Sequence, residues 1–478
     1  MKERLADLNR IRVISILALF NFIFLGTEYL FDNMMTHVTD SGEVVLAQSY
    51  ILGASVIGFL LFAPVKRFFT ESIKQTVIFV SSIISIICIF LIEQHTSYEM
   101  ILLSGCILFI LLGMAGSAVH YLAACVLRER GHLAKTVGIA YAVGLLLQFV
   151  NNNVVDNDTI EAVILSIFLT VWVVLGMRLW REAATGEAVF GETEEKKQYA
   201  VKRPLVAGIT MVVCVILMTC IFATLDNVVT LYHAAGGMDI GQWPRLLLAL
   251  SGLVAGFLFD IKERRYMNII MYCVTLLSTM CVLIIVSGGS FLVGLVVFYL
   301  SAGFFVVFFT TGFMDLSYYM KTPAFWAGLG RATNNLCAVV TGTISLALIE
   351  AGDAMRISII ALALFALISV MNFIHANQLR KDAGGEESEK QGKEEKNRDD
   401  AEKFLNFAKE YALTVREQDV LKMLLTSDDS VQEIADSLFI SRAALYRHIT
   451  SINEKTETKS RIGLLQFYYA WKEEKWNG

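Results

Sequence analysis

Apolar residues dominate the chain up to about residue 378, in blocks separated by short polar or charged connections. Each block is roughly 18 to 25 residues long, enough for a helix to cross the hydrocarbon core of a bilayer. The sequence contains 4 prolines, which favours long uninterrupted helices. The pattern predicts twelve spans, near residues 12–32, 44–63, 75–92, 100–122, 134–155, 160–180, 205–231, 243–260, 266–287, 290–313, 324–349 and 354–377.

A charged segment separates this apolar region from a shorter soluble one. Of the 21 residues from 380 to 400, 14 are charged and three are glycine. Such a composition cannot bury enough apolar surface to offset the entropy lost on ordering. The sequence therefore predicts a transmembrane domain at 1–378, a flexible charged linker at 379–400 and a small helical domain at 401–478.

The small domain carries the signals of an entry helix and four further helices. Apolar residues at helical spacing from Phe404 to Tyr411 predict the entry helix. Thr414-Val415-Arg416-Glu417 and Ser430-Val431-Gln432-Glu433 are capping boxes, which satisfy free backbone N–H groups at a helix start. Ser441 is the expected N-cap of a helix at 442–454, and the last helix is expected at about 460–474.

Composition agrees with a membrane protein. Hydrophobic residues make up 55% of the chain, charged residues 18%, and the mean hydropathy is +0.58, which lies outside the range of soluble globular proteins. The 8 cysteines all fall in apolar blocks without CxxC spacing, so we predict neither metal sites nor disulfides. The sequence contains no nucleotide-binding loop or nucleophile constellation, so we expect no enzymatic activity and no cofactor.

Basic residues alternate between the connections. Lysine and arginine gather at the N-terminus, in every second connection and after the last span, whereas the other connections hold mainly acids and amides. The positive-inside rule then predicts a multi-pass membrane protein with both termini in the cytoplasm. The connections expected to face outside are 32–43, 93–99, 151–161, 232–242, 288–290 and 350–353.

The two halves of the apolar region repeat at an offset of 198 positions. The matching pairs are Glu28 with Asp226, Gly58-Phe59-Leu60 with Gly256-Phe257-Leu258, and Lys66-Arg67 with Arg264-Arg265. After Gly256 come Asp260 and a basic cluster, whereas Phe62 takes the place of the aspartate in the first half. This plan resembles the major facilitator superfamily. The resemblance implies an all-α fold, a twelve-helix transmembrane bundle of two six-helix repeats.

The small domain resembles the LuxR/NarL-type helix-turn-helix family over residues 411–466. The matching residues are Leu413-Thr414, Arg416-Glu417, Val420-Leu421, Glu433-Ile434-Ala435, Leu438-Phe439-Ile440-Ser441, His448, Ile452, Lys455 and Arg461. The resemblance implies that helix 442–454 enters the major groove of double-stranded DNA and that the last helix supports dimerisation. The implied DNA-binding residues are Ser441, Arg442, Tyr446, Arg447, His448, Thr450, Lys455 and Arg461.

The charge of this domain qualifies the DNA-binding hypothesis. Residues 401–478 hold 11 Lys/Arg against 12 Asp/Glu, although 441–461 holds five basic residues against two acidic ones. A single head should therefore bind DNA weakly, and we expect a homodimer on two half-sites. Tyr446 stands where the family usually has a lysine, so sequence preference should differ. A helical protein-interaction module is the alternative for the head, and packing or phosphate contact the alternative for His448.

Ionisable residues within spans are costly unless they have partners or a function. Glu28 lies about 16 residues into the first span, roughly 24 Å from its start at 1.5 Å per residue. Asp226 has the equivalent depth in the seventh span. Two interpretations remain open: the two acids flank a ligand site, or neighbours such as Asn21, Thr27 and Asn227 hold them by hydrogen bonds.

Other polar residues in the spans also allow two interpretations. Arg331 either pairs with Asp315 across a helix hairpin or binds a ligand together with Asn334. His120 and Gln148 either line the same cavity or form hydrogen bonds between helices. The candidate ligand-sensing residues are Glu28, Asp226, His120, Gln148, Arg331 and Asn334.

Together, the two regions predict a membrane-embedded transcription regulator. The bundle would sense an unknown small molecule, and the head would bind DNA. The alternative is a secondary transporter with a regulatory DNA-binding tail.

Overall fold

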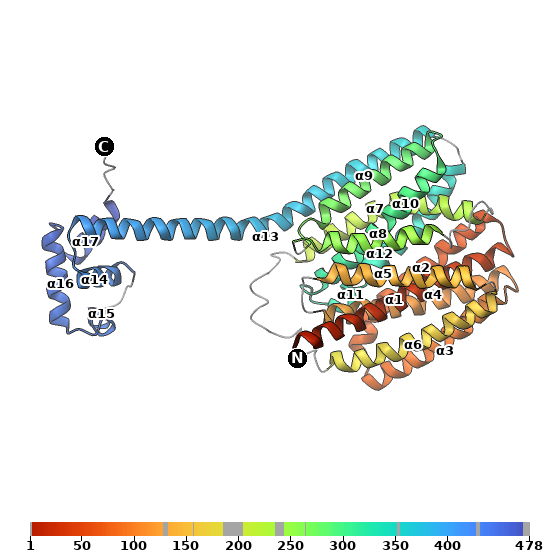
Figure 1. The fold of residues 1–478 in the computed structure, drawn as a ribbon, viewed down its shortest axis with the longest axis horizontal. Coiled ribbons are helices and arrows are strands. Elements are labelled where there is room, and N and C mark those ends of the chain that lie inside the picture. Colours follow the sequence, from red (N-terminus) through yellow and green to blue (C-terminus); the bar gives the residue numbers. More distant parts are fainter. Residues whose placement is uncertain are drawn as a thin grey trace. The chain divides into compact units, whose positions relative to one another are not determined.

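The computed structural model describes residues 2–127, 132–155, 157–184, 204–234, 243–262, 264–350, 354–426 and 431–471. The chain divides into two compact units, Met1–Leu379 and Arg380–Gly478. The described elements are all helices, as the predicted all-α fold requires. Those of the first unit (Figure 1) are α1 (Lys2–Thr36), α2 (Ser41–Phe68), α3 (Glu71–Glu93), α4 (Tyr98–Val126), α5 (Leu133–Val154), α6 (Asp158–Ala184), α7 (Pro204–Ala234), α8 (Trp243–Phe259), α9 (Met267–Val286), α10 (Phe291–Ser317), α11 (Pro323–Trp326), α12 (Leu329–Glu350) and the start of α13 (Ala354–Glu410).

Each of the twelve apolar blocks coincides with a helix, except that 324–349 is divided between α11 and α12. Ten helices in the described part of the chain are long and apolar enough to cross a membrane. Helix α8 is apolar but has 17 residues, and α12 is absent from the ten. Between α11 and α12, Gly328 lies against α4, where a Cβ atom would come within 2.9 Å of the Ser117 Cα.

Helices α5 and α8, from different halves, meet along a seam of glycines. A Cβ atom at Gly138 would lie 2.6 Å from the Gly252 carbonyl oxygen and 2.8 Å from the Gly256 Cα. A Cβ at Gly256 would in turn lie 2.7 Å from the Ala134 carbonyl oxygen. The two backbones therefore touch directly, and no other residue type fits these positions without displacement.

A buried carboxylate fastens one end of this seam. Asp260, directly after α8, accepts hydrogen bonds from the backbone N–H groups of Ala134 (3.1 Å) and Lys135 (2.7 Å) at the start of α5. The Arg264 guanidinium lies 3.5 Å from the Asp260 carboxylate and 3.2 Å from that of Asp315. The aspartate of the sequence motif thus joins the two halves, because a helix N-terminus presents free N–H groups to an anion.

The equivalent position in the first half has aromatic contacts instead. Phe62 packs against Tyr121 and Trp180, with ring centroids 5.9 and 6.3 Å apart. The Lys66 ammonium lies 4.6 Å from the centre of the Tyr121 ring. These contacts lie within helices α2, α4 and α6, all of the first half.

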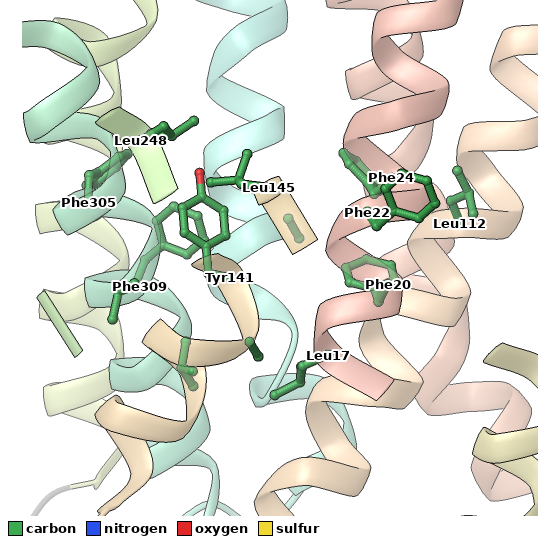
Figure 2. Close-up of a cluster of buried hydrophobic side chains, with 14 of the residues drawn as sticks. Leu17, Phe20, Phe22, Phe24, Leu112, Tyr141, Leu145, Leu248, Phe305 and Phe309 are labelled. Carbon is green, nitrogen blue, oxygen red and sulfur yellow. The ribbon is translucent and has the colours of Figure 1, made fainter. Parts of the chain in front are cut away.

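The interior of the bundle is mainly aromatic and aliphatic. Figure 2 shows Phe20, Phe22 and Phe24 following one another along α1, and Tyr141 of α5 and Phe309 of α10 belong to the same buried cluster. Phe24 meets Phe109 of α4 edge-on at 5.0 Å. Such edge-to-face contacts add to the burial of apolar area that holds neighbouring helices together.

Helix α13 continues through residues 379–400, where composition predicts a linker without regular structure. Sequence spacing gives a physical reason for the helix. Glu386 precedes Lys390, Glu389 precedes Lys393 and Glu394 precedes Arg398, each by four residues. Such acid–base spacing favours helices. The boundary between the two units still falls next to this segment, after Leu379, and its flexibility stays a prediction.

The second unit contains the end of α13 and helices α14 (Val415–Thr426), α15 (Val431–Ser437), α16 (Arg442–Lys455) and α17 (Arg461–Ala470). Its core residues come from every one of these helices. They include Phe407, Leu421, Ile434, Leu445, Ile452 and Leu464, each 0% exposed. The predicted entry helix is the end of α13, and the predicted 442–454 helix is α16.

Candidate functional site

The two halves of the bundle enclose a central cavity of about 150 Å³. Of the candidate ligand-sensing residues, Glu28, Arg331 and Asn334 line it. Asp226 lies in α7, and its side chain is outside the described residues. His120 and Gln148 do not belong to the cavity lining.

One wall of the cavity is acidic. Glu28 and Asp32 lie one turn apart on α1, and the Gln48 amide of α2 donates to both carboxylates, at 3.1 Å each. Asp32 and Gln48 are buried, at 4% and 7% exposure. Charged and amide groups held together in this way are costly in a membrane protein unless they serve a purpose. Asp32 and Gln48 are not among the predicted residues, although the four-residue spacing from Glu28 to Asp32 places both acids on one face of α1.

A basic group, Arg331 of α12, lies against the same helix α1, one to two turns before Glu28. Arg331, 7% exposed, donates to the Asn21 side-chain oxygen at 3.4 Å, and its guanidinium lies 5.2 and 5.9 Å from the ring centres of Phe24 and Phe309. Among the described residues, no carboxylate lies within ion-pairing distance of this guanidinium. A buried guanidinium that lies beyond ion-pairing distance of every described carboxylate favours an anionic group of a ligand.

The predicted pair of Arg331 with Asp315 is wrong. Asp315 pairs with Arg264 of the loop after α8. The prediction assumed one straight hairpin, in which equal distances from the turn give equal depth. The chain instead forms the short helix α11 before α12 begins at Leu329, so this count does not hold.

A chain of polar side chains includes two residues of α12 that follow Arg331. Thr219 donates to Asn334 at 3.5 Å, Asn334 to Asn335 at 3.3 Å, and Asn335 to Ser55 at 2.8 Å. Arg245 of α8 also lines the cavity, and its Nε is buried without a hydrogen-bond partner among the described residues. Arg245 is not among the residues predicted from the sequence to sense a ligand, because it lies near the start of a predicted span.

The two remaining candidates make local contacts. The His120 Nδ1 lies 2.6 Å from the Gly116 carbonyl oxygen, and its ring meets Phe20 edge-on. The Gln148 amide donates to the Leu25 carbonyl oxygen of α1 at 2.8 Å. The Gln148 bond joins two helices, which is the alternative considered for both residues, whereas the His120 bond stays within α4.

In the head, the first capping box is present. The Thr414 N–H donates to the Glu417 carboxylate at 2.7 Å, and the Glu417 N–H donates to the Thr414 hydroxyl at 3.4 Å. The same carboxylate accepts from Ser451 and from the Lys455 ammonium, both at 2.6 Å. Burial alone would raise the pKa of Glu417, but these hydrogen bonds outweigh burial and lower it to about 2. The second predicted box begins at Ser430, outside the described residues.

Helix α16 turns a polar face to the surface. Its Ser441 N-cap accepts from the Ala444 N–H at 3.2 Å. Leu445, Ile449 and Ile452 are buried, so the helix is held by one apolar stripe. The exposed residues on the other side include Ser441, Arg442, Tyr446, Arg447 and Thr450.

The other candidate DNA-binding residues are less accessible. His448 and Arg461 are half-buried. Lys455 donates to Glu417 and to the Ala412 carbonyl oxygen, at 2.6 and 2.9 Å, which ties it to the capping box.

The turn before α16 contains Phe439, whose side chain is 95% exposed. Its φ of 57° lies in a backbone region that non-glycine residues rarely adopt.

Residues 411–468 match the protein family described as bacterial regulatory proteins, luxR family. The head is therefore a LuxR-type helix-turn-helix DNA-binding domain. No curated protein matches the chain as a whole or in part at a significant level.

Solved transporters resemble the bundle in fold. An auto-inhibited POT family peptide transporter has a TM-score of 0.54 at 13% identity, covering 77% of this chain and 96% of that one. A variant of the E. coli fucose:proton symporter FucP has 0.51 at 12% identity, covering 77% and 99%. A POT family transporter in complex with a thioalcohol-conjugated peptide has 0.55 at 10% identity, covering 77% and 96%. The chain thus joins a membrane domain with a major-facilitator-like transporter fold to a LuxR-type head.

Proposed function

We propose that this protein is a membrane-embedded transcription regulator, in which a small molecule bound in the central cavity controls DNA binding by the head. The observation that carries the proposal is the union of a LuxR-type domain with a transporter-fold bundle in one chain. A ligand changes the output by binding one arrangement of the bundle more tightly than another.

DNA binding is assigned to the exposed face of α16, with two heads pairing on two half-sites. Arg447 and Tyr446 lie at the centre of that face. Footprinting of the full chain on promoter regions near its own gene tests this assignment. Arg447→Ala should weaken specific binding by about 1–3 kcal/mol if the arginine contacts a base edge. Lys422→Ala removes an exposed basic side chain from α14. This variant is the matched control and should leave the footprint intact.

The charges of the cavity suggest the ligand class. Arg331 and Arg245 favour an anionic group, and the wall of Glu28, Asp32 and Gln48 favours a cationic or hydroxyl-rich group. Asp226 stays a candidate on the second-half side. Arg331→Gln should raise the inducer concentration needed for transcription by about tenfold or more, since a charge-assisted hydrogen bond contributes about 1.5–3 kcal/mol. An unchanged dose response in a stable variant would contradict this assignment.

We further propose twelve spans, with both termini in the cytoplasm. The alternation of basic connections supports this topology. Ten long apolar helices account for ten spans, and α8 and α12 are the two further helices needed to reach twelve. Cysteine labelling at Asp40, Asp158 and Ser287 tests the orientation, because all three should react from outside the cell. Labelling from the cytoplasmic side alone would overturn it.

The alternative function is a secondary transporter with a regulatory DNA-binding tail, which the transporter fold of the bundle favours. Uptake of the inducing compound by cells that express the chain without residues 401–478 separates the two functions. Robust accumulation would support the transporter.

A further inference from the structure

A second cavity, of about 130 Å³, lies inside the first half of the bundle, between α3, α4 and α6. Its lining is almost wholly apolar and includes Leu112, Met114 and Met177. At Gly176 of α6, a Cβ atom would meet no other atom within 4 Å. The cavity therefore borders open space at Gly176, on a helix whose neighbouring residues are partly exposed.

Charged side chains line the end of this cavity where α2 and α6 finish and α3 begins. They are Lys66, Glu71, Lys74 and Arg181. The Glu71 carboxylate accepts from the Lys74 ammonium at 2.6 Å and from the Trp180 indole at 3.2 Å, which fixes both groups at the opening. Among the described side chains, three cations against one carboxylate give the opening a net positive charge.

We propose that this cavity binds an acidic phospholipid of the surrounding bilayer. One acyl chain lies between α3, α4 and α6, and the phosphate of the headgroup contacts Lys66, Lys74 and Arg181. Selectivity comes from the headgroup, because an acyl chain gains little by moving from lipid to an apolar protein wall. Each basic residue near the membrane surface favours an acidic lipid by about fivefold. The site is separate from the central cavity, and the proposal does not depend on the ligand that occupies that cavity.

Native mass spectrometry of the full chain, incubated with equal amounts of palmitoyl-oleoyl phosphatidylglycerol and phosphatidylcholine, tests the proposal. The wild type should retain phosphatidylglycerol preferentially. Lys66→Gln/Arg181→Gln should reduce that preference by at least about tenfold. Lys262→Gln/Arg265→Gln removes two exposed cations from the loop after α8 and should leave the preference unchanged. Glu71→Gln should increase it, because it removes the negative charge at the opening.

The variant Gly176→Leu tests whether the acyl chain enters the cavity. Its side chain fills the open space, so retention of phosphatidylglycerol should fall even though all three cations remain. Circular dichroism melting confirms that each variant is folded. The proposal is overturned if both double variants reduce the preference equally, or if folded Gly176→Leu retains lipid like the wild type. Detection of a dimer without bound lipid would indicate that a second copy of the chain covers the cavity. This result would also overturn the proposal.

Discussion

Both units of this protein contain a buried carboxylate that binds backbone N–H groups and a basic side chain. In the bundle, Asp260 joins the start of α5 to Arg264. In the head, Glu417 joins the start of α14 to Lys455. In each case one acid satisfies groups at a helix start that would otherwise lack partners.

The two carboxylates differ in burial and in what they connect. The side chains of Asp260 and Arg264 are 0% and 6% exposed, whereas those of Glu417 and Lys455 are 5% and 31% exposed. Asp260 binds a helix about 125 residues away and from the other half, whereas Glu417 belongs to a local capping box. Removing one partner of an ion pair lowers the free energy of unfolding more when both partners are buried, because the remaining charge is left unpaired away from water. The bundle should therefore depend more strongly on its acid than the head does.

Asp260→Asn should give the largest effect. The variant leaves a buried guanidinium with Asp315 alone and weakens two backbone hydrogen bonds, a loss of about 3–5 kcal/mol. The thermal midpoint of the purified full chain should fall by several degrees. Asp40→Asn is the control, because Asp40 caps α2 by the same kind of contact at an exposed position. Equal shifts for both variants would show that burial of the pair contributes nothing.

Glu417→Gln should destabilise the head less, by about 2–3 kcal/mol. The amide removes the charge that binds Lys455 but keeps an acceptor for Thr414 and Ser451. Urea unfolding of residues 401–478 measures the change. Glu454→Gln removes an exposed acid from α16 and should change stability by less than about 0.5 kcal/mol. A larger loss of unfolding free energy in Glu454→Gln than in Glu417→Gln would contradict the stabilising role of Glu417.

The head should also lose stability in acid. The pKa of Glu417 is near 2 in the folded head, below its ordinary value of 4.5. Its contribution is therefore complete above about pH 4.5 and is lost as the pH falls toward 2. By linkage the loss is about 2 kcal/mol at pH 3. The urea midpoint of residues 401–478, measured from pH 6 to 3, should fall along this course. In Glu417→Gln the midpoint should depend less on pH. If the midpoints of the two proteins fall in parallel, other groups cause the acid sensitivity.

Lys455→Met should have the smallest effect, about 1 kcal/mol of head stability, because its ammonium is partly hydrated. The sequence assigned Lys455 to DNA, whereas its contacts to Glu417 and Ala412 indicate a structural role. When the variant is fully folded, its affinity for DNA should therefore differ little from that of the wild type. A tenfold loss of affinity in fully folded Lys455→Met would restore the DNA-contact hypothesis.

The same two acids show how far sequence alone predicts this molecule. The capping box of Thr414 and Glu417 was predictable, because both partners lie within four residues. The link from Glu417 to Lys455 and that from Asp260 to α5 were not, because no local pattern reveals which distant helix packs nearby. Apolar blocks predicted the positions of the helices for a similar reason, since span length is a local property.

The cavity residues were predicted in part. Glu28 and Arg331 were identified because charges inside apolar blocks are conspicuous. Their partners were not, since Gln48 is a polar residue of ordinary appearance and Asn21 was considered as a neighbour of Glu28, whereas it accepts from Arg331. The Arg331–Asp315 pair failed because counting residues from a turn ignores a break such as the one between α11 and α12.

The glycine seam between α5 and α8 has a mechanical consequence. With the Gly138 and Gly256 backbones in contact, α5 and α8 have no side chain between them at these positions. Two rigid bodies that rotate against each other move least where they touch and most at their far ends. A rotation of one half against the other about this seam would therefore displace the helix ends far more than the seam itself.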